Sequence, residues 1–327
     1  MSAGPRIAIA LFNLGGPHAI ADVKPFLLNL FRDPDIFPLP ALLRGALARL
    51  IVARRLKEVE HRYGLIGGSS PLLRWSDVQA RLLEHALHER GVDAQVAVAM
   101  RYHTPTARAA LSALLERGRP ARIIGLPLYP HESIATTGSS AKDFRAALAD
   151  LAPDVPFTLV REYHDHPLYI EALVECVRAG LAQFAPGDPV CLLFSAHSLP
   201  QKIIAAGDPY LAQIERTMKL VLERLAWAGR FELAFQSRAG PVRWLAPSTD
   251  QMLRSLAHES QRRVLVVPIS FVSDHIETLF EIDMLYADQA RALGITEFKR
   301  APSINDSPTF IRAMVDVVGR TIAAAAT

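Results

Sequence analysis

Short apolar runs that alternate with helical stretches constrain the fold more than any other feature of this sequence. Four runs lie in the first half (RIAIALFNL, QVAVAMRY, ARIIGLPLY and PFTLVREY) and four in the second (PVCLLFSAH, FELAFQSR, RRVLVVPIS and ITEFKRAPS). Helical candidates at residues 74–90, 167–183 and 208–227 lie between them. Because continuous apolar runs are typical of strands covered on both faces, the pattern predicts parallel sheets flanked by helices. We therefore expect an α/β protein with two doubly wound domains, each built on a four-stranded parallel sheet.

The length of the chain agrees with two such domains. The sequence has 327 residues, 50% of them hydrophobic, and a typical domain holds about 150 residues. The linker is expected near HDHPLY at residues 164–169, which gives domains at residues 1–166 and 167–327. The last helix, at about residues 306–324, could pack on either half, including back on the first. ARIIGLPLYPHESIATT and RRVLVVPISFVSDHIETL are alike, which hints at duplication.

Composition excludes several classes of protein. The net charge of +3 is too small to coat a nucleic-acid backbone. No window reaches the roughly 20 apolar residues of a membrane span, and the N-terminus lacks a signal-peptide pattern. Two cysteines in apolar segments, Cys176 and Cys191, favour a reducing cytoplasmic compartment. No dinucleotide-binding or phosphate-binding glycine loop occurs, so nucleotide cofactors have no support.

One segment departs from the α/β pattern. Residues 36–57 carry an apolar stretch that ends in Arg54, Arg55 and Lys57. The simpler interpretation is a helix packed on the body with a solvated basic end. The alternative is an amphipathic lip that contacts a membrane or covers an apolar ligand.

Polar residues gather where the predicted strands end, which is where ligands bind in such folds. His197 ends PVCLLFSAH, and the stretch at residues 273–290 follows VLVVPIS and is predicted to be a helix. At an α-helical spacing Asp274, Glu277 and Glu281 fall within an arc of roughly 60°. A structural histidine and a capping box of Asp274 with Glu277 are the alternatives, but capping leaves Glu281 unexplained.

If the second sheet is parallel, the histidine and the carboxylates emerge at one edge. An imidazole facing carboxylates can bind a divalent ion such as Fe²⁺ and can move protons near neutral pH. A structural zinc site needs about four ligands, which this set does not supply. The pattern favours an ion that arrives, loses its water and leaves.

Ordered blocks along residues 6–312 resemble the ferrochelatase family, bacterial type, whose members insert Fe²⁺ into a porphyrin at the end of haem synthesis. The blocks are NLGGP, FLLNLF, YGLIGGSSPL, MRYHTP, LPLYPHESIATTGSS, FSAHSLP, FQSRAGPVRWLAP and VPISFVSDHIETLFEID. The resemblance implies a Rossmann-like, chelatase-like fold with the porphyrin in a cleft between the domains. It implies a lyase acting on protoporphyrin IX, with residues 36–72 as the porphyrin lip.

The resemblance also implies the site residues. His197 matches the active-site histidine, Glu277 the carboxylate facing it, and both are the implied metal ligands. Asp274, His275 and Glu281 match the polar track behind them. The implied substrate-binding residues, which include the lip residues for the propionates and the apolar and aromatic walls, are Leu14, Arg54, Arg55, Tyr63, Ser70, Arg101, Tyr102, Trp244 and His275.

Fe²⁺ is therefore expected as a substrate, with no tightly bound cofactor. Two cysteines cannot ligate an iron–sulfur cluster, which typically needs about four. Expected partners are protoporphyrin IX, ferrous iron, a membrane surface at the lip, and transiently the preceding enzyme of the haem pathway. The alternatives are a chelatase for coproporphyrin III or another tetrapyrrole, and a non-catalytic haem or porphyrin carrier. The expected location is the cytoplasm, with peripheral contact at the inner face of the membrane.

Overall fold

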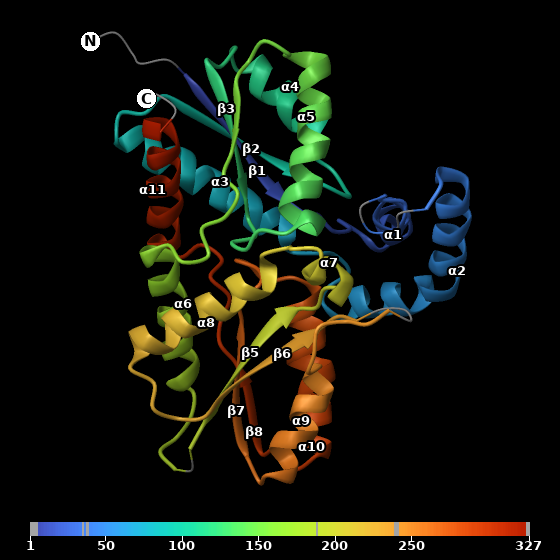
Figure 1. Cartoon of the computed structure of the whole chain (residues 1–327), viewed down its shortest axis with the longest axis vertical. Coiled ribbons are helices and arrows are strands. Elements are labelled where there is room, and N and C mark those ends of the chain that lie inside the picture. The colour runs from blue at the N-terminus through green and yellow to red at the C-terminus, as the bar shows by residue number, and fades with distance from the viewer. Residues whose placement is uncertain (1–5, 35, 37–38, 188, 239–241, 325–327) are drawn as a thin grey trace. The chain divides into compact units, whose positions relative to one another are not determined.

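The chain divides into two compact units, shown in Figure 1. The first comprises Met1–Glu162 and Ile311–Thr327, and the second comprises Tyr163–Phe310. The computed structural model describes residues 6–34, 36, 39–187, 189–238 and 242–324. Residues 37–38 of the expected lip lie outside the described residues. The sequence predicts a division after residue 166, whereas the structural division falls after Glu162.

Each unit is built on a four-stranded parallel sheet, so the prediction from the apolar runs is confirmed. The first sheet has the order β2 (Ala94–Met100), β1 (Ile7–Asn13), β3 (Arg122–Pro127), β4 (Phe157–Leu159). The second has the order β6 (Phe231–Gln236), β5 (Cys191–His197), β7 (Arg263–Pro268), β8 (Glu297–Arg300). The two orders are the same when the strands of each unit are counted along the chain.

Helices connect the strands and cover both faces of the sheets, as parallel connections require. In the first unit they are a short 3₁₀ helix η1 (Ile20–Asp22), α1 (Val23–Phe31), α2 (Ala41–Leu65), α3 (Leu72–Glu89), α4 (Ala107–Glu116), a π-helix η2 (Ile134–Gly138) and α5 (Ser139–Leu151). In the second they are α6 (Pro167–Leu181), α7 (Gln201–Ala205), α8 (Tyr210–Leu225), α9 (Thr249–His258), a π-helix η3 (Glu277–Tyr286) and α10 (Ala287–Ala292). Helix α11 (Pro308–Ala324) falls mostly in the first unit.

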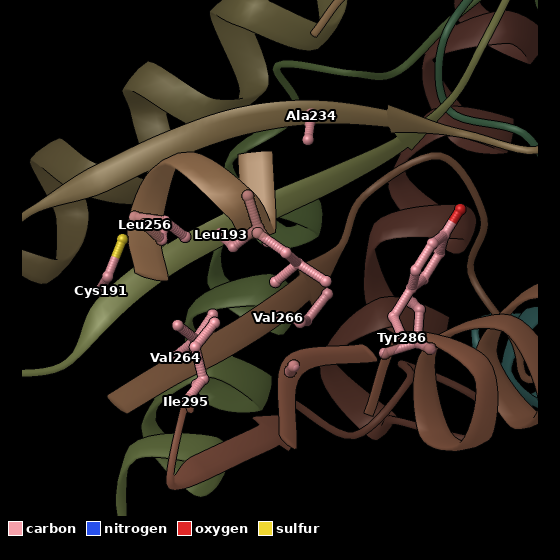
Figure 2. Packing of buried hydrophobic residues seen from close by; sticks show 11 residues of the cluster. Cys191, Leu193, Ala234, Leu256, Val264, Val266, Tyr286 and Ile295 are labelled. Carbon is pink, nitrogen blue, oxygen red and sulfur yellow. The ribbon is translucent and has the colours of Figure 1, made fainter. Parts of the chain in front are cut away.

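Alternate residues of the second sheet pack on opposite layers. Val264 and Val266 join a buried cluster with residues of α9, η3 and α10, which Figure 2 shows from close by. Leu265 points to the other face, where a Cβ added to Gly180 of α6 would lie 2.8 Å from its Cδ1. Burial on both faces explains why the central strands β5 and β7 are apolar through most of their length rather than alternating.

The two cysteines differ in how far they are buried. Cys191 begins β5 and is buried, while Cys176 lies in α6 and is half-buried. Burial raises the pKa of each thiol to about 12. Neither thiol is therefore ionised near neutral pH.

The helix after β7 differs from the prediction. The sequence predicts an α-helix over residues 273–290, whereas the structure has a π-helix from Glu277 to Tyr286. Asp274 precedes this helix instead of lying on its face. A π-helix is rare and occurs mostly as a single turn within an α-helix, so the α-helical periodicity of the sequence could not reveal it. No helix among the described residues is long and apolar enough to cross a membrane.

Candidate active site

His197 is held rigidly at the carboxyl end of β5. Its backbone N–H donates to Ser270 Oγ (2.8 Å), and its carbonyl accepts from the hydroxyl of Tyr210 (2.9 Å). Tyr210 Oη and Ser270 Oγ also contact each other at 2.8 Å. Because β7 pairs with β5 in parallel, Ser270 follows β7 at the same edge of the sheet. The main chain of the histidine is thus fixed from two neighbouring elements.

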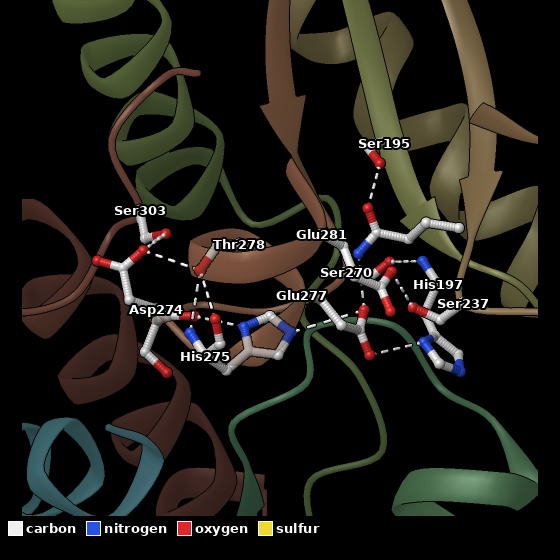
Figure 3. A network of polar contacts seen from close by, with 12 residues as sticks. Ser195, His197, Ser237, Ser270, Asp274, His275, Glu277, Thr278, Glu281 and Ser303 are labelled. Atoms are coloured by element: carbon white, nitrogen blue, oxygen red, sulfur yellow. Dashed lines mark hydrogen bonds and ion pairs between the residues drawn. The ribbon is translucent and has the colours of Figure 1, made fainter. Parts of the chain in front are cut away.

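The imidazole of His197 faces a carboxylate. Its Nδ1 lies 2.9 Å from Glu277 Oε1, and the side chain of His197 is 33% exposed (Figure 3). A carboxylate accepts, so Nδ1 carries the proton of this hydrogen bond. In the neutral ring Nε2 then keeps its lone pair, which can accept a proton or bind a metal ion.

Glu277 lies among three partners. Its Oε1 accepts from His197, and its Oε2 accepts from the amide of Gln236 at 2.8 Å. The buried Nε2 of His275 lies 3.6 Å from Oε2, beyond hydrogen-bond distance. Burial alone would raise the pKa of Glu277, but the two imidazoles outweigh burial and hold it well below its usual range. Glu277 is therefore a carboxylate near neutral pH.

The environment shifts the pKa of His197 in the opposite direction. Burial lowers this pKa, but the charge and hydrogen bond of Glu277 and the charge of Glu281 outweigh it. The pKa of His197 is accordingly raised above its ordinary value of 6.5. The pair therefore favours a proton on the imidazole and none on the carboxylate.

Gln236 is a site residue that the sequence interpretation missed. It ends β6 and lies in register with His197 of β5. Its Oε1 accepts from Ser195 Oγ at 2.6 Å, which fixes the amide so that its nitrogen points at Glu277. The usable signal was its position at the end of a strand that neighbours the strand of His197.

The three predicted carboxylates separate into different environments. Glu281 Oε2 accepts from Ser237 Oγ at 2.7 Å. Asp274 lies on the opposite side of Glu277 from His197 in Figure 3 and accepts from Thr278 (3.1 Å), Ser303 (2.7 Å) and Asn305 (2.9 Å). The expected stripe on one face of an α-helix is therefore wrong, because Asp274 precedes a π-helix.

Trp244 lies on the loop before α9 and forms an isolated bridge with Pro200. Its indole N–H is buried and has no hydrogen-bond partner among the described residues. The loop after β5 and the loop before α9 are therefore joined near His197.

In the first unit, Arg101 and Tyr102 follow β2 and converge on a buried carboxylate. Asp33 Oδ2 accepts from Arg101 Nη2 (2.7 Å), the Tyr102 hydroxyl (2.8 Å) and Ser139 Oγ (2.9 Å). Burial, followed by the charge of Asp33, raises the pKa of Tyr102 far above its ordinary value. Asp33 was not identified from the sequence, since it lies in a helix-ending segment without a strand before it.

Three more predicted residues of this unit, Leu14, Tyr63 and Ser70, lie around the loop after β1. Leu14 is half-buried, and its carbonyl accepts from the backbone of Tyr102 at 2.9 Å. Ser70 is buried against Gly16, where an added Cβ would lie 2.5 Å from Ser70 Cβ and 3.9 Å from the hydroxyl of Tyr63. Tyr63 and Ser70 thus border the NLGGP loop.

Arg54 and Arg55 lie on α2. Arg54 is exposed and Arg55 is half-buried, and neither has an ion-pair partner among the described residues. Within the described ranges no group of three or more His, Cys, Asp or Glu residues could hold a metal ion.

Comparisons with known proteins place the chain in one family. A family model described as Ferrochelatase matches residues 6–322. The protein named ferrochelatase from Geotalea daltonii is 48% identical over 314 residues, which cover 96% of this chain and 97% of the relative. The one from Aquifex aeolicus is 43% identical over 311 residues, which cover 95% and 97%.

Solved structures support the fold alone. The structure described as SirB from Bacillus subtilis with Fe³⁺ has a TM-score of 0.57 and 12% identity, and covers 97% of this chain and 95% of that chain. The structure described as CbiX, the terminal enzyme for biosynthesis of sirohaem in denitrifying bacteria, has a TM-score of 0.50 and 14% identity. The coverage here is 96% of this chain and 98% of that chain. The predicted chelatase-like fold is therefore confirmed.

Proposed function

Since the chain belongs to the ferrochelatase family, we infer that it inserts ferrous iron into a porphyrin in haem synthesis. It is thus a lyase of the metal-chelatase type. The observation that supports this function at a particular site is the 2.9 Å contact between His197 Nδ1 and Glu277 Oε1 at the end of β5.

The chemistry requires a proton acceptor and a way to desolvate the ion. A free-base porphyrin carries two N–H protons, both of which leave when Fe²⁺ enters the ring. We propose that His197 Nε2 accepts these protons one at a time, and that the Glu277 carboxylate stabilises the imidazolium that forms. The exposed part of the imidazole passes each proton to water. Binding of the iron by the same nitrogen is the second role that we propose for His197.

Glu281 and Gln236 have supporting roles in this proposal. Gln236 keeps Glu277 oriented by donating to Oε2, and Glu281 adds negative charge that raises the pKa of His197. Negative charge at this edge also favours the approach of a divalent cation.

The porphyrin that we propose is protoporphyrin IX. The support is the resemblance of QSRAGPVRWLAP and SDHIETL to the protoporphyrin branch of the family. Arg54 and Arg55 are proposed to bind the propionates, because a guanidinium makes charge-assisted bonds with carboxylates. Leu14, Tyr63, Ser70, Arg101, Tyr102, Trp244 and His275 are proposed to contact the substrate.

The test is insertion of Fe²⁺ and Zn²⁺ into protoporphyrin IX and coproporphyrin III by purified protein. We expect His197→Ala to abolish insertion and Glu277→Gln to lower kcat by at least about 10²-fold, because positioned acid–base groups contribute this much. A matched control is His85→Ala, since His85 and Glu89 form an exposed pair on α3 at 3.4 Å. Near wild-type turnover of His197→Ala would refute the site, and preference for coproporphyrin III would refute the substrate.

We further propose that α2 contacts lipid, and that the protein lies in the cytoplasm at the inner face of the membrane. Leu42, Leu43 and Leu50 are 89%, 61% and 49% exposed. At 3.6 residues per turn Leu43, Leu50 and Arg54 lie on one face of the helix. Exposed leucines beside basic side chains are typical of helices that lie in an anionic membrane surface.

A further inference from the structure

A half-buried guanidinium at the end of β8 contacts the acidic segment at two separate points. Arg300 is the last residue of β8, and its side chain is 12% exposed. Its Nε and Nη2 donate to the two oxygens of Asp283, at 2.8 and 2.9 Å. Its Nη1 lies 3.1 Å from Asp274 Oδ1 and 3.2 Å from Ser303 Oγ. One side chain therefore binds a residue before η3 and a residue inside it.

We propose that Arg300 is a positioning residue for metal insertion, which fixes the segment carrying Glu277 and Glu281 by binding Asp274 and Asp283 together. The proposal rests on the proposed function of the His197–Glu277 pair. It assigns Asp274 a structural part through Arg300 instead of the part in the polar track that the resemblance implies.

The contacts of Asp274 support this assignment. Both of its carboxylate oxygens are occupied, Oδ1 by Thr278, Ser303 and Arg300 and Oδ2 by Asn305. Its own backbone N–H donates to Asn305 Oδ1 at 2.9 Å. A carboxylate with this many donors anchors its segment to the chain after β8.

The shape of η3 explains why such an anchor is needed. A π-helix is rare and usually spans a single turn at a functional site, whereas η3 runs over 10 residues. Glu277 begins η3 and Glu281 lies further along it, so both lie between the two aspartates that Arg300 binds. The bidentate pair with Asp283 fixes the helix in orientation as well as in place.

The sheet connects the anchor to the catalytic histidine. Strand β8 pairs with β7, and β7 pairs with β5, which ends at His197. Arg300 therefore ties η3 to the same rigid sheet that carries the imidazole. Displacement of a catalytic group by about 1 Å can cost about 10²-fold in rate. We expect loss of Arg300 to misplace Glu277 relative to His197.

The experiment compares Arg300→Met with Arg263→Met. Arg263 is a matched control, because it is a buried arginine that begins β7 and pairs with Glu297, at the amino ends of the strands and away from the end that carries His197. Both changes should lower the melting temperature. Only Arg300→Met should lower kcat for insertion, by about 10²-fold, while the KM for porphyrin stays within about twofold of wild type.

Two milder variants separate positioning from folding. Arg300→Lys keeps a charge but loses the planar fork that reaches both aspartates, so we expect kcat to remain at least about tenfold below wild type. Asp283→Asn changes the partner of Arg300 on η3. The side chain of Asp283 is 36% exposed, and we expect this variant also to lower kcat. These two variants decide the question if Arg300→Met does not fold.

A kcat of Arg300→Met, or of both milder variants, equal to that of Arg263→Met would overturn the proposal. If wild type inserts iron and His197→Ala does not, equal kcat values of the Arg300 and Arg263 variants would overturn the positioning role and leave the proposed function intact. Absence of insertion by wild type would overturn the proposed function, and the positioning role with it.

Discussion

At His197 two opposing influences act on one imidazole, and the balance has a consequence for stability. Burial lowers the pKa, while Glu277 and Glu281 raise it above 6.5. A raised pKa means that protonated His197 stabilises the folded state. Its contribution to the free energy of unfolding is complete below pH 6.5 and disappears as the pH rises through the raised pKa. For Glu277, whose pKa is lowered below 4.5, the contribution is present above pH 4.5 and disappears as the pH falls through the lowered pKa.

The pair should therefore stabilise the fold most between pH 4.5 and 6.5. We expect the difference in melting temperature between wild type and Glu277→Gln to be largest in this window and to shrink on either side. Thermal unfolding followed by circular dichroism across the pH range measures it. The control is Glu89→Gln, which removes an exposed carboxylate beside His85. A difference that stays constant from pH 5 to pH 9 would contradict the prediction.

Individual residues were predictable where they occupy strand ends or recognisable blocks. His197 and Glu277 lie in FSAHSLP and SDHIETL, and the structure brings them together. The partners that orient them were not predictable, because two helices, η3 and α10, lie between Asp274 and the strand that ends at Arg300. Spatial proximity of this kind depends on the sheet order, which no local pattern contains.

Among the elements, the strands were predictable and the π-helix was not. The eight runs correspond to the eight strands of the two described sheets, and the apolar pattern is most continuous in central strands such as β1 and β5, which are buried on both faces. The segment ETLFEIDMLY has apolar residues that fit an α-helical spacing, yet it forms a π-helix. In both units a π-helix follows the third strand, η2 after β3 and η3 after β7, in line with the duplication inferred from the sequence.

The exposed face of α2 gives a prediction for lipid binding. We expect wild type to float with vesicles containing phosphatidylglycerol and not with phosphatidylcholine alone. Each basic residue near an anionic surface contributes about 1 kcal/mol, so Arg54→Gln with Arg55→Gln should weaken binding by roughly 30-fold. Leu43→Ser with Leu50→Ser should also release the protein, whereas Leu82→Ser on α3, also an exposed leucine, should not. Equal flotation of all variants would refute the lipid contact.

For the whole molecule, the sequence predicted two units of the same architecture but not where the last helix belongs. Helix α11 is apolar enough to cover either sheet, and the division groups Ile311–Thr327 with the first unit. The local apolar periodicity predicts that a helix forms. The sheet on which the helix packs depends on which sheet surface the other helices leave uncovered.

The cysteine content of the whole chain gives a prediction about cofactors. We propose that no iron–sulfur cluster is bound, since the chain has two cysteines and a cluster typically needs about four. Substrate-free protein should show no visible charge-transfer absorption and no acid-labile sulfide. A visible spectrum with stoichiometric sulfide would contradict this.

The withdrawn thiols of Cys176 and Cys191 also make the chain a ready background for site-directed labelling. With pKa values of about 12, each is a thiolate in only about one part in 10⁵ at pH 7. Maleimide probes should therefore ignore the wild type and react with a cysteine introduced at an exposed position such as Leu43. A fluorophore placed there would report the movements of α2 while the native cysteines remain in place.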